Sequence, residues 1–285
     1  TISDNVLVTG GKFANDPASS VDKYANKTAL VNGAYVVVEK SQDEINAALS
    51  ADGITAATGT GSTRAYFDTV QHAWDSSTST TWTYVEMLGD ASENIERVKN
   101  SQLGLKLNGH TFTGSIDTTK EGARKAVAIQ TAGTAVLTKV VSTSFTMDND
   151  EKTIVTLKDG DVSGELKVTK GTLTIEGGTY AGKISGSTVG KLWVKGGTFA
   201  NDPTKYLVDG YIAAPTGEGS FEVRDFVYVT VPEIANATVK VTVDGSEVEL
   251  VDGKIKAPVG SRVVVSYEPV QDWVNAAEFV VPPTE

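Results

Sequence analysis

The chain has 285 residues, of which 40% are hydrophobic and 21% charged, so it can bury a sizeable core and is not disordered as a whole. Its formal net charge of −11 argues against nucleic acid and anionic membrane surfaces as partners, because both bind basic faces. The absence of cysteine excludes disulfides, thiolate metal sites and cysteine nucleophiles, and no apolar run is long enough for membrane insertion.

The first element, Val6–Phe13, introduces an octapeptide that recurs along the chain: apolar, any, apolar, any, Gly or Asp, Gly or His, any, apolar. Apolar residues two apart share one face of a strand, and the central pair permits a tight corner. The last three copies start 18 and 19 residues apart, which is about one coil of a three-sided solenoid. We therefore predict an all-β fold, a right-handed parallel β-helix. The other copies begin at Leu105, Val155, Leu173 and Leu192.

Residues 1–50 are predicted to be the terminal coil or tail of a preceding repeat module, because they hold this early copy. Within them, apolar residues four apart predict a helix over 42–50. Residues 51–65, which contain a Gly/Ser/Thr-rich stretch at 58–63, are predicted to form a linker.

Residues 66–210 are predicted to form the β-helix itself. Phe67, Val70 and Trp74 lie at helical spacing, so we expect a short amphipathic helix over 66–74 that covers the open end of the solenoid. Strands should follow from Thr83 onward. The stacked coils should form two interior columns, Val155 with Leu173 and Leu192, and Leu157 with Ile175 and Val194.

The stretch 113–154 breaks the regular spacing, even if Val127–Ile129 marks a coil, and it is a candidate for a functional insertion. Residues 211–225 are predicted to be a second linker. In 226–285, four β-rich segments are separated by Asp-Gly and Gly turns. They predict a small antiparallel β-sandwich or meander.

These residues resemble a known family. Leu105–Phe112, preceded by Tyr84–Asp90, resembles the first full coil of pectate-lyase-like β-helix modules in surface and secreted proteins of Gram-positive gut bacteria. The stretch Gly196–Pro203 resembles the closing coil of such modules, and Gly10–Pro17 repeats it. The C-terminal segment is similar to small β-rich surface repeats. The resemblance implies an extracellular or cell-surface protein with this shape, and it implies no particular chemistry.

Acidic residues at the corners are the first candidates for chemistry. Asp159, Asp161 and Glu165 lie at or beyond one corner, but the matching corners of the next two coils carry Gly and Thr, so we predict a solvated turn and no catalytic residue. Asp148, Asp150 and Glu151 form the densest acidic cluster, a candidate Ca²⁺ site or an exposed turn.

Two further residues are site candidates. His110 occupies a corner position that is Gly in two sister coils, so we interpret it as a turn residue and neither a ligand nor a base. Strand alternation points Trp193 outward, beside Thr174 and Thr156 of neighbouring coils. An exposed Trp can stack on a sugar ring or anchor a protein partner, and the alternative is packing under a neighbouring loop. We expect no cofactor.

Three functions remain open from the sequence. The first is an extracellular or cell-surface binding and scaffold module for adhesion, with a glycan or a host surface protein as partner. The second is a carbohydrate-active enzyme, a polysaccharide lyase or glycoside hydrolase, and two carboxylates about 5–10 Å apart in a lateral pocket would favour it. The third is a structural stalk without a ligand.

Overall fold

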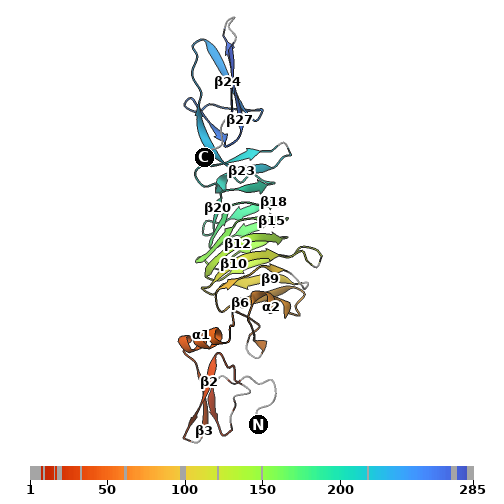
Figure 1. The fold of residues 1–285 in the computed structure, drawn as a ribbon, viewed down its shortest axis with the longest axis vertical. Helices are drawn as coiled ribbons and strands as arrows, with labels where there is room; N and C mark the ends of the chain where they lie inside the picture. Colours follow the sequence, from red (N-terminus) through yellow and green to blue (C-terminus); the bar gives the residue numbers. More distant parts are fainter. Residues whose placement is uncertain are drawn as a thin grey trace.

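The structure of the protein is a computed structural model, which describes residues 8, 10–15, 17, 21–32, 34–60, 63–96, 101–120, 122–148, 150–216, 218–270 and 275–280. Strands dominate it, and its centre is a parallel β-helix of about six turns. Figure 1 shows an elongated molecule in which a small N-terminal unit, the stack of coils and a C-terminal sandwich follow one another along the long axis. The predicted fold class is confirmed.

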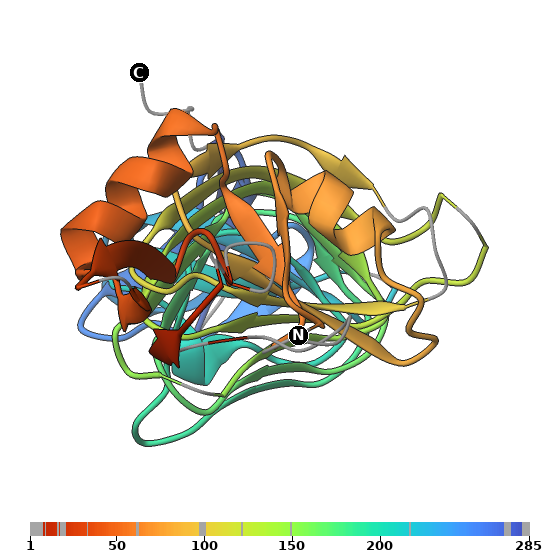
Figure 2. The same ribbon diagram turned by 90° about the horizontal axis from the view of Figure 1, so that it is seen from below.

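Each coil of the β-helix contributes strands to three parallel ladders, and Figure 2 looks along the stack of coils. The first ladder consists of β6 (Trp82–Met87), β9 (Gln102–Lys106), β11 (Val127–Gln130), β13 (Phe145–Met147), β16 (Leu166–Val168) and β19 (Ile184–Gly186). The second consists of β7 (Ala91–Ser92), the first parts of β10 (Thr111–Asp117) and β12 (Gly133–Ser142), β14 (Thr153–Leu157), β17 (Thr172–Ile175) and β20 (Lys191–Val194). The third consists of β8 (Ile95–Glu96), the remainders of β10 and β12, β15 (Gly160–Val162), β18 (Thr179–Tyr180) and β21 (Gly197–Phe199).

The two predicted interior columns are present. Val155 pairs with Leu173 and Leu173 with Leu192, while Leu157, Ile175 and Val194 pair in the same way. All six side chains are buried in one continuous core that runs through the stack. Their alternation along each strand is what directs them inward, and neighbouring coils complete the burial.

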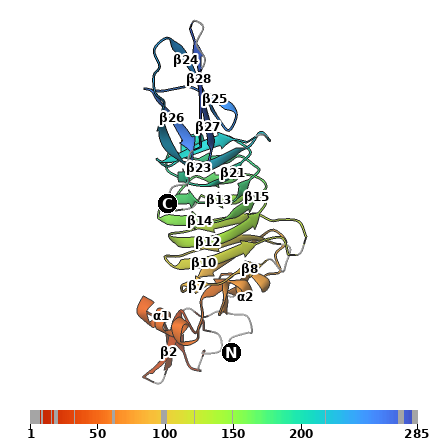
Figure 3. The ribbon, with the colours of Figure 1, turned by 45° about the horizontal axis from the view of Figure 1, so that its top comes forward.

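The octapeptide at Leu105–Phe112 occupies a different corner from the later copies. Leu105 lies in the first ladder, where it pairs with Ile129, whereas Val155 lies in the second ladder. The segment Val127–Ile129 is therefore a coil marker of the first ladder. The irregular spacing across 113–154 arose partly from comparing residues on different faces. The remaining irregularity is the connection that follows Asp117, which protrudes from the stack in Figure 3.

The glycine corners of the last coils stack on one another. Asp161, Thr179 and Thr198 pair in the third ladder, so the glycines just before them form a column. A Cβ on Gly178, whose φ is +104°, would lie 2.2 Å from the backbone nitrogen of Gly160. A side chain at this corner would thus push two coils apart. The column consists of Gly160, Gly178 and Gly197.

The N-terminal end of the solenoid carries a cap. Helix α2 (Val70–Asp75) begins after Thr69, whose side chain accepts a hydrogen bond from the backbone N–H of His72, and it buries Val70 and Trp74. The observed helix is therefore shorter than the helix predicted over 66–74, because Phe67 belongs to strand β5 (Ala65–Phe67). Strand β4 (Ala56–Thr58) pairs with β5 and with β6, so the predicted linker 51–65 contributes to the cap.

The C-terminal end continues into the sandwich without an open linker. Strands β22 (Tyr211–Pro215) and β23 (Phe221–Thr230) form a hairpin within the predicted linker 211–225, and β23 also pairs with β21. The second half of β23 pairs with β26 (Lys254–Pro258). This pair packs on a second sheet over a separate core. The second sheet consists of β24 (Ala237–Val243), β25 (Ser246–Val248), β27 (Arg262–Pro269) and β28 (Asn275–Val280).

The N-terminal unit repeats the closing structure of the β-helix. It has strands β1 (Gly11–Phe13), β2 (Asn26–Val31) and β3 (Ala34–Glu39), followed by helix α1 (Gln42–Ala51), which begins with a capping box and confirms the helix predicted there. Val8 bridges to Val21 as Val194 bridges to Leu207. In addition, β1 pairs with β3 as β21 pairs with β23. The described part of this unit is thus a second closing structure, and a preceding module stays a prediction.

Candidate functional site

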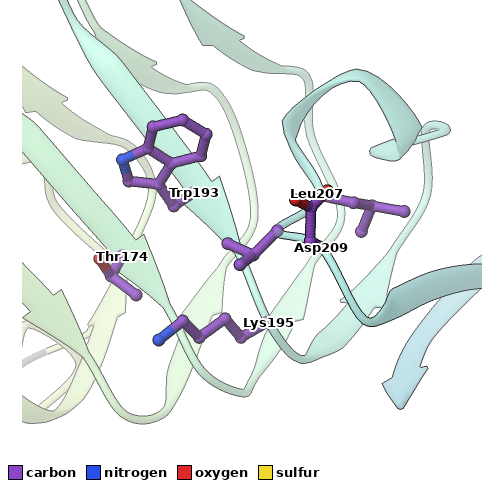
Figure 4. A pocket seen from close by; sticks show the side chains of 6 residues that line it. Thr174, Trp193, Lys195, Leu207 and Asp209 are labelled. Carbon is purple, nitrogen blue, oxygen red and sulfur yellow. The ribbon is translucent and has the colours of Figure 1, made fainter. Parts of the chain in front are cut away.

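Trp193 lies on the outer face of the second ladder, near the closing end of the solenoid (Figure 4). It pairs with Thr174, which pairs with Thr156, so the predicted neighbours are the observed ones. Its side chain is 43% exposed. The alternation that buries Leu192 and Val194 leaves the indole on the outside.

A pocket of about 420 Å³ opens beside this indole. One wall is the ladder itself, with Thr174 and Lys195. The other wall is the segment 207–209, which follows the 3₁₀ turn Thr204–Tyr206. The backbone N–H of Val208 donates to the carbonyl of Val194 over 3.1 Å, so this segment is fixed against β20 as the start of a further coil.

A second pocket of about 640 Å³ is also lined by this segment. Its far wall is aromatic: the rings of Phe226 and Tyr228 meet edge to face with centroids 5.3 Å apart. The ammonium of Lys256 lies 4.8 Å from the Phe226 ring and 6.0 Å from the Tyr228 ring. We call the two pockets together the junction groove, because they share residues 207–209 where the β-helix meets the sandwich.

The junction groove combines aromatic faces with isolated charges. Tyr228 is 62% exposed, so both ends of the groove offer a ring to a ligand. Within the described residues, Lys195 and Asp209 form no ion pair with the protein. Burial, and to a lesser extent the neighbouring Asp225 carboxylate, raises the pKa of the Tyr211 hydroxyl.

This arrangement has the features of a ligand-binding surface. Rings at both ends, with donors and acceptors between them, match a ligand that has apolar faces and polar edges. Among the described residues, Asp209 is the carboxylate that lines the groove, and the Asp225 carboxylate lies against the hydroxyl of Tyr211.

The acidic corner residues lie elsewhere. Asp161 is held by Arg124, whose two guanidinium nitrogens lie 2.6 and 2.5 Å from the two carboxylate oxygens. Asp159 lies 3.9 Å from the Nζ of Lys139, and Glu165 accepts a hydrogen bond from the hydroxyl of Ser185. The Arg124–Asp161 pair ties the connection after Asp117 to a coil far along the chain, which the sequence pattern did not reveal.

The predicted metal residues form a turn. Asp148 and Glu151 are exposed, and the Asp150 carboxylate accepts the backbone N–H of Lys152 over 2.7 Å. In the part of the chain that the structure describes, no three His, Cys, Asp or Glu side chains gather as metal ligands. The calcium site at Asp148, Asp150 and Glu151 stays a prediction.

His110 lies at the corner before β10, where its Nδ1 is 3.7 Å from a carboxylate oxygen of Asp90. This position agrees with its interpretation as a turn residue.

Sequence reasoning identified Trp193 but missed the rest of the junction groove. Phe226, Tyr228 and Lys256 come from strands predicted to belong to a separate module. Only the pairing of β23 with both β21 and β26 brings them next to residues 207–209. The alternation of Phe226 and Tyr228 along one strand was the available signal, because it places two aromatic rings on one face.

No family model, curated protein or solved structure matches this chain. Among the described residues, no helix has the length and apolar character needed to cross a membrane.

Proposed function

We propose that this chain is an extracellular or cell-surface binding and scaffold module whose junction groove binds a glycan. The observation that carries the proposal is the exposed indole of Trp193 in the first pocket, next to a second pocket that holds the exposed ring of Tyr228 and shares residues 207–209 with the first. Pyranose rings have apolar faces that stack on aromatic rings and hydroxyl edges that need polar partners. The groove supplies both.

The fold itself does not need an aromatic residue at this position. The residues that precede Trp193 in its column are Thr174, Thr156 and Val136, one in each earlier coil. These smaller side chains support the same ladder pairing. A large indole at the position nearest the groove is therefore better explained by a ligand than by packing.

The stack of coils supports the scaffold part of the proposal. Each coil packs on its neighbours, which makes a solenoid a stiff spacer. At its N-terminal end, the Tyr66 hydroxyl donates to the Asp22 carboxylate over 2.5 Å, and the Tyr24 and Tyr66 rings lie 4.3 Å apart. These contacts fix the N-terminal unit to the cap. The resemblance to surface modules of Gram-positive gut bacteria is part of this proposal, and with it the cell-surface location and a role in adhesion.

A glycan array, run beside a turnover assay on polyuronides and plant polysaccharides, tests the proposal. We expect a glycan to bind without being cleaved. Trp193→Ala should weaken binding about 30-fold, since an aromatic anchor at the centre of an interface contributes about 2 kcal/mol.

The matched control is Ile154→Ala, which removes another exposed apolar side chain from the same ladder, outside the junction groove. It should leave binding unchanged. Turnover of any of these polysaccharides would refute the binding-module function in favour of an enzyme. Equal effects of the two substitutions would remove Trp193 from the site.

A further inference from the structure

A second groove lies at the opposite end of the β-helix, on the first ladder. It has a volume of about 420 Å³. Its sides are residues 58–60 at the end of β4 and the loop 76–78 after α2, and its floor is formed by outward side chains of β6 and β9. We call it the cap groove. It shares no residue with the junction groove.

The floor of the cap groove is aromatic and fixed in place. Tyr84 pairs with Gly104 on the neighbouring strand, and its ring covers this glycine so closely that a Cβ there would lie 2.5 Å from a ring carbon. The ring of Trp82 is nearly parallel to that of Tyr84, at 17°, with centroids 6.0 Å apart. Tyr84 nevertheless stays 45% exposed. An exposed, immobilised ring loses little conformational entropy when a flat ligand stacks on it.

One cation remains in excess beside this floor. Glu86, whose side chain is only 20% exposed, lies 2.9 Å from a guanidinium nitrogen of Arg64 and 3.1 Å from the Nζ of Lys106. Burial acts to raise the pKa of Glu86, but the hydrogen bonds from Arg64 and Lys106 outweigh it and hold the pKa below its usual range. One carboxylate thus faces two cations. Glu86 and Lys106 both line the groove, whereas Arg64, the second partner of Glu86, does not. The Nζ of Lys106 lies 5.6 Å from the centre of the Tyr84 ring.

The sides of the cap groove carry hydroxyl groups. Ser77 and Thr83 are hydrogen-bonded to each other over 2.7 Å. The side-chain hydroxyl groups of Thr58, Thr60 and Thr78 make no hydrogen bond within the described part of the chain. They are free to donate to or accept from a ligand.

We infer that the cap groove is a separate binding site for an acidic saccharide, with a sugar ring on Tyr84 and Trp82 and its carboxylate at Lys106. Three features select this class of ligand together: the aromatic floor, the free hydroxyls and the excess positive charge. The protein as a whole has a net charge of −11, which repels acidic glycans. A local cation is therefore required for such a ligand to bind, and Lys106 provides one.

Isothermal titration of the full chain with hexagalacturonate, and with neutral cellohexaose for comparison, tests the inference. We expect hexagalacturonate to bind and Lys106→Gln to weaken that binding at least about tenfold, because a hydrogen bond to a charged group is lost. Lys167→Gln is the matched control, since Lys167 is exposed on β16 of the same ladder. It should bind as the unsubstituted chain does.

Three results would overturn the inference: no binding of hexagalacturonate, equal affinities in the two lysine variants, or equal affinity for cellohexaose. Tyr84→Ala adds a second measurement, with thermal unfolding to establish that it folds. Trp193→Ala separates the two grooves. It should leave hexagalacturonate binding at the cap groove intact, and a loss of that binding would assign the ligand to the junction groove instead. If no glycan binding depends on Trp193 but hexagalacturonate binding depends on Lys106, the proposed role of the junction groove is refuted and the cap-groove inference is supported.

Discussion

Gly178→Ala tests whether the glycine column sets the distance between coils. Gly178 has a φ of +104°, and an added Cβ would lie 2.2 and 2.3 Å from the nitrogen and oxygen of Gly160. Those atoms belong to the backbone of the preceding coil, so they cannot rotate away as a side chain would. To reach an ordinary contact of 3.4 Å, the two coils must separate by more than an ångström.

The expected cost has two parts. The strained backbone contributes about 1–3 kcal/mol, and the overlap with the neighbouring coil contributes about 1–3 kcal/mol more. Gly109→Ala separates them, because Gly109 also has a positive φ of +88° at a corner of the β-helix but has no atom within 4 Å of an added Cβ. The loss of freedom in the unfolded chain is the same in both variants and cancels in the comparison.

Urea unfolding followed by circular dichroism measures the difference. We expect Gly178→Ala to lose about 1–3 kcal/mol more of the free energy of unfolding than Gly109→Ala does. Equal losses would show that the coils yield freely at this corner, and the column would then be a matter of backbone conformation alone.

Three further predictions concern the core, the cap and the connection after Asp117. Phe199→Ala should lower the free energy of unfolding by about 3–5 kcal/mol in urea, because the buried ring stacks on Tyr180 with centroids 4.8 Å apart. Tyr228→Ala, which removes an exposed ring, should change it by less than about 0.5 kcal/mol. Burial, followed by the hydrogen bond to Asp22, raises the pKa of Tyr66 to about 12. Folding thus favours the neutral form of Tyr66. The resulting contribution to the free energy of unfolding is fully present below the unfolded tyrosine pKa of about 10 and is lost as the pH rises toward 12. The melting temperature should therefore fall more steeply in this window than that of Tyr66→Phe, and parallel curves would contradict the assignment. Arg124→Ala should change the free energy of unfolding by no more than about 1 kcal/mol, but it should speed cleavage of the connection by a glutamate-specific protease. Unchanged cleavage would show that the ion pair does not restrain it.

The interior of the β-helix was predictable because it repeats. Leu173 and Leu192 stand at the same place in consecutive octapeptides, and a coil that cannot bury its own apolar face must align them. The outward direction of Trp193 followed from the same alternation. Residues two apart in one strand share a face of the sheet, so this information is local and does not depend on distant segments.

Other features depended on segments far apart in the chain. The Leu105 octapeptide has the right pattern, but only its pairing with Ile129 reveals which face it occupies. Parts of both predicted linkers form strands in the structure. Residues 56–58 pair with the edge of β6, and residues 221–223 pair with the edge of β21. Of the Gly/Ser/Thr-rich stretch at 58–63, only Thr58 belongs to β4, so the residues that joined a sheet are the ones just before that stretch, whose backbone groups find partners along the edge of β6.

The all-β solenoid, the interior columns and the exposure of Trp193 can be derived from the amino-acid sequence alone, since they follow from a two-residue alternation and a repeat that needs its neighbours. Tertiary structure decided where the grooves lie. Tyr228 and Trp193 share the junction groove because β23 runs from the closing coil into the sandwich. Lys106 shares the cap groove with Tyr84 because consecutive coils bring β6 and β9 together. A local sequence pattern predicts which side chains face outward, but only the pairing of strands far apart in the sequence determines which of those side chains lie next to one another.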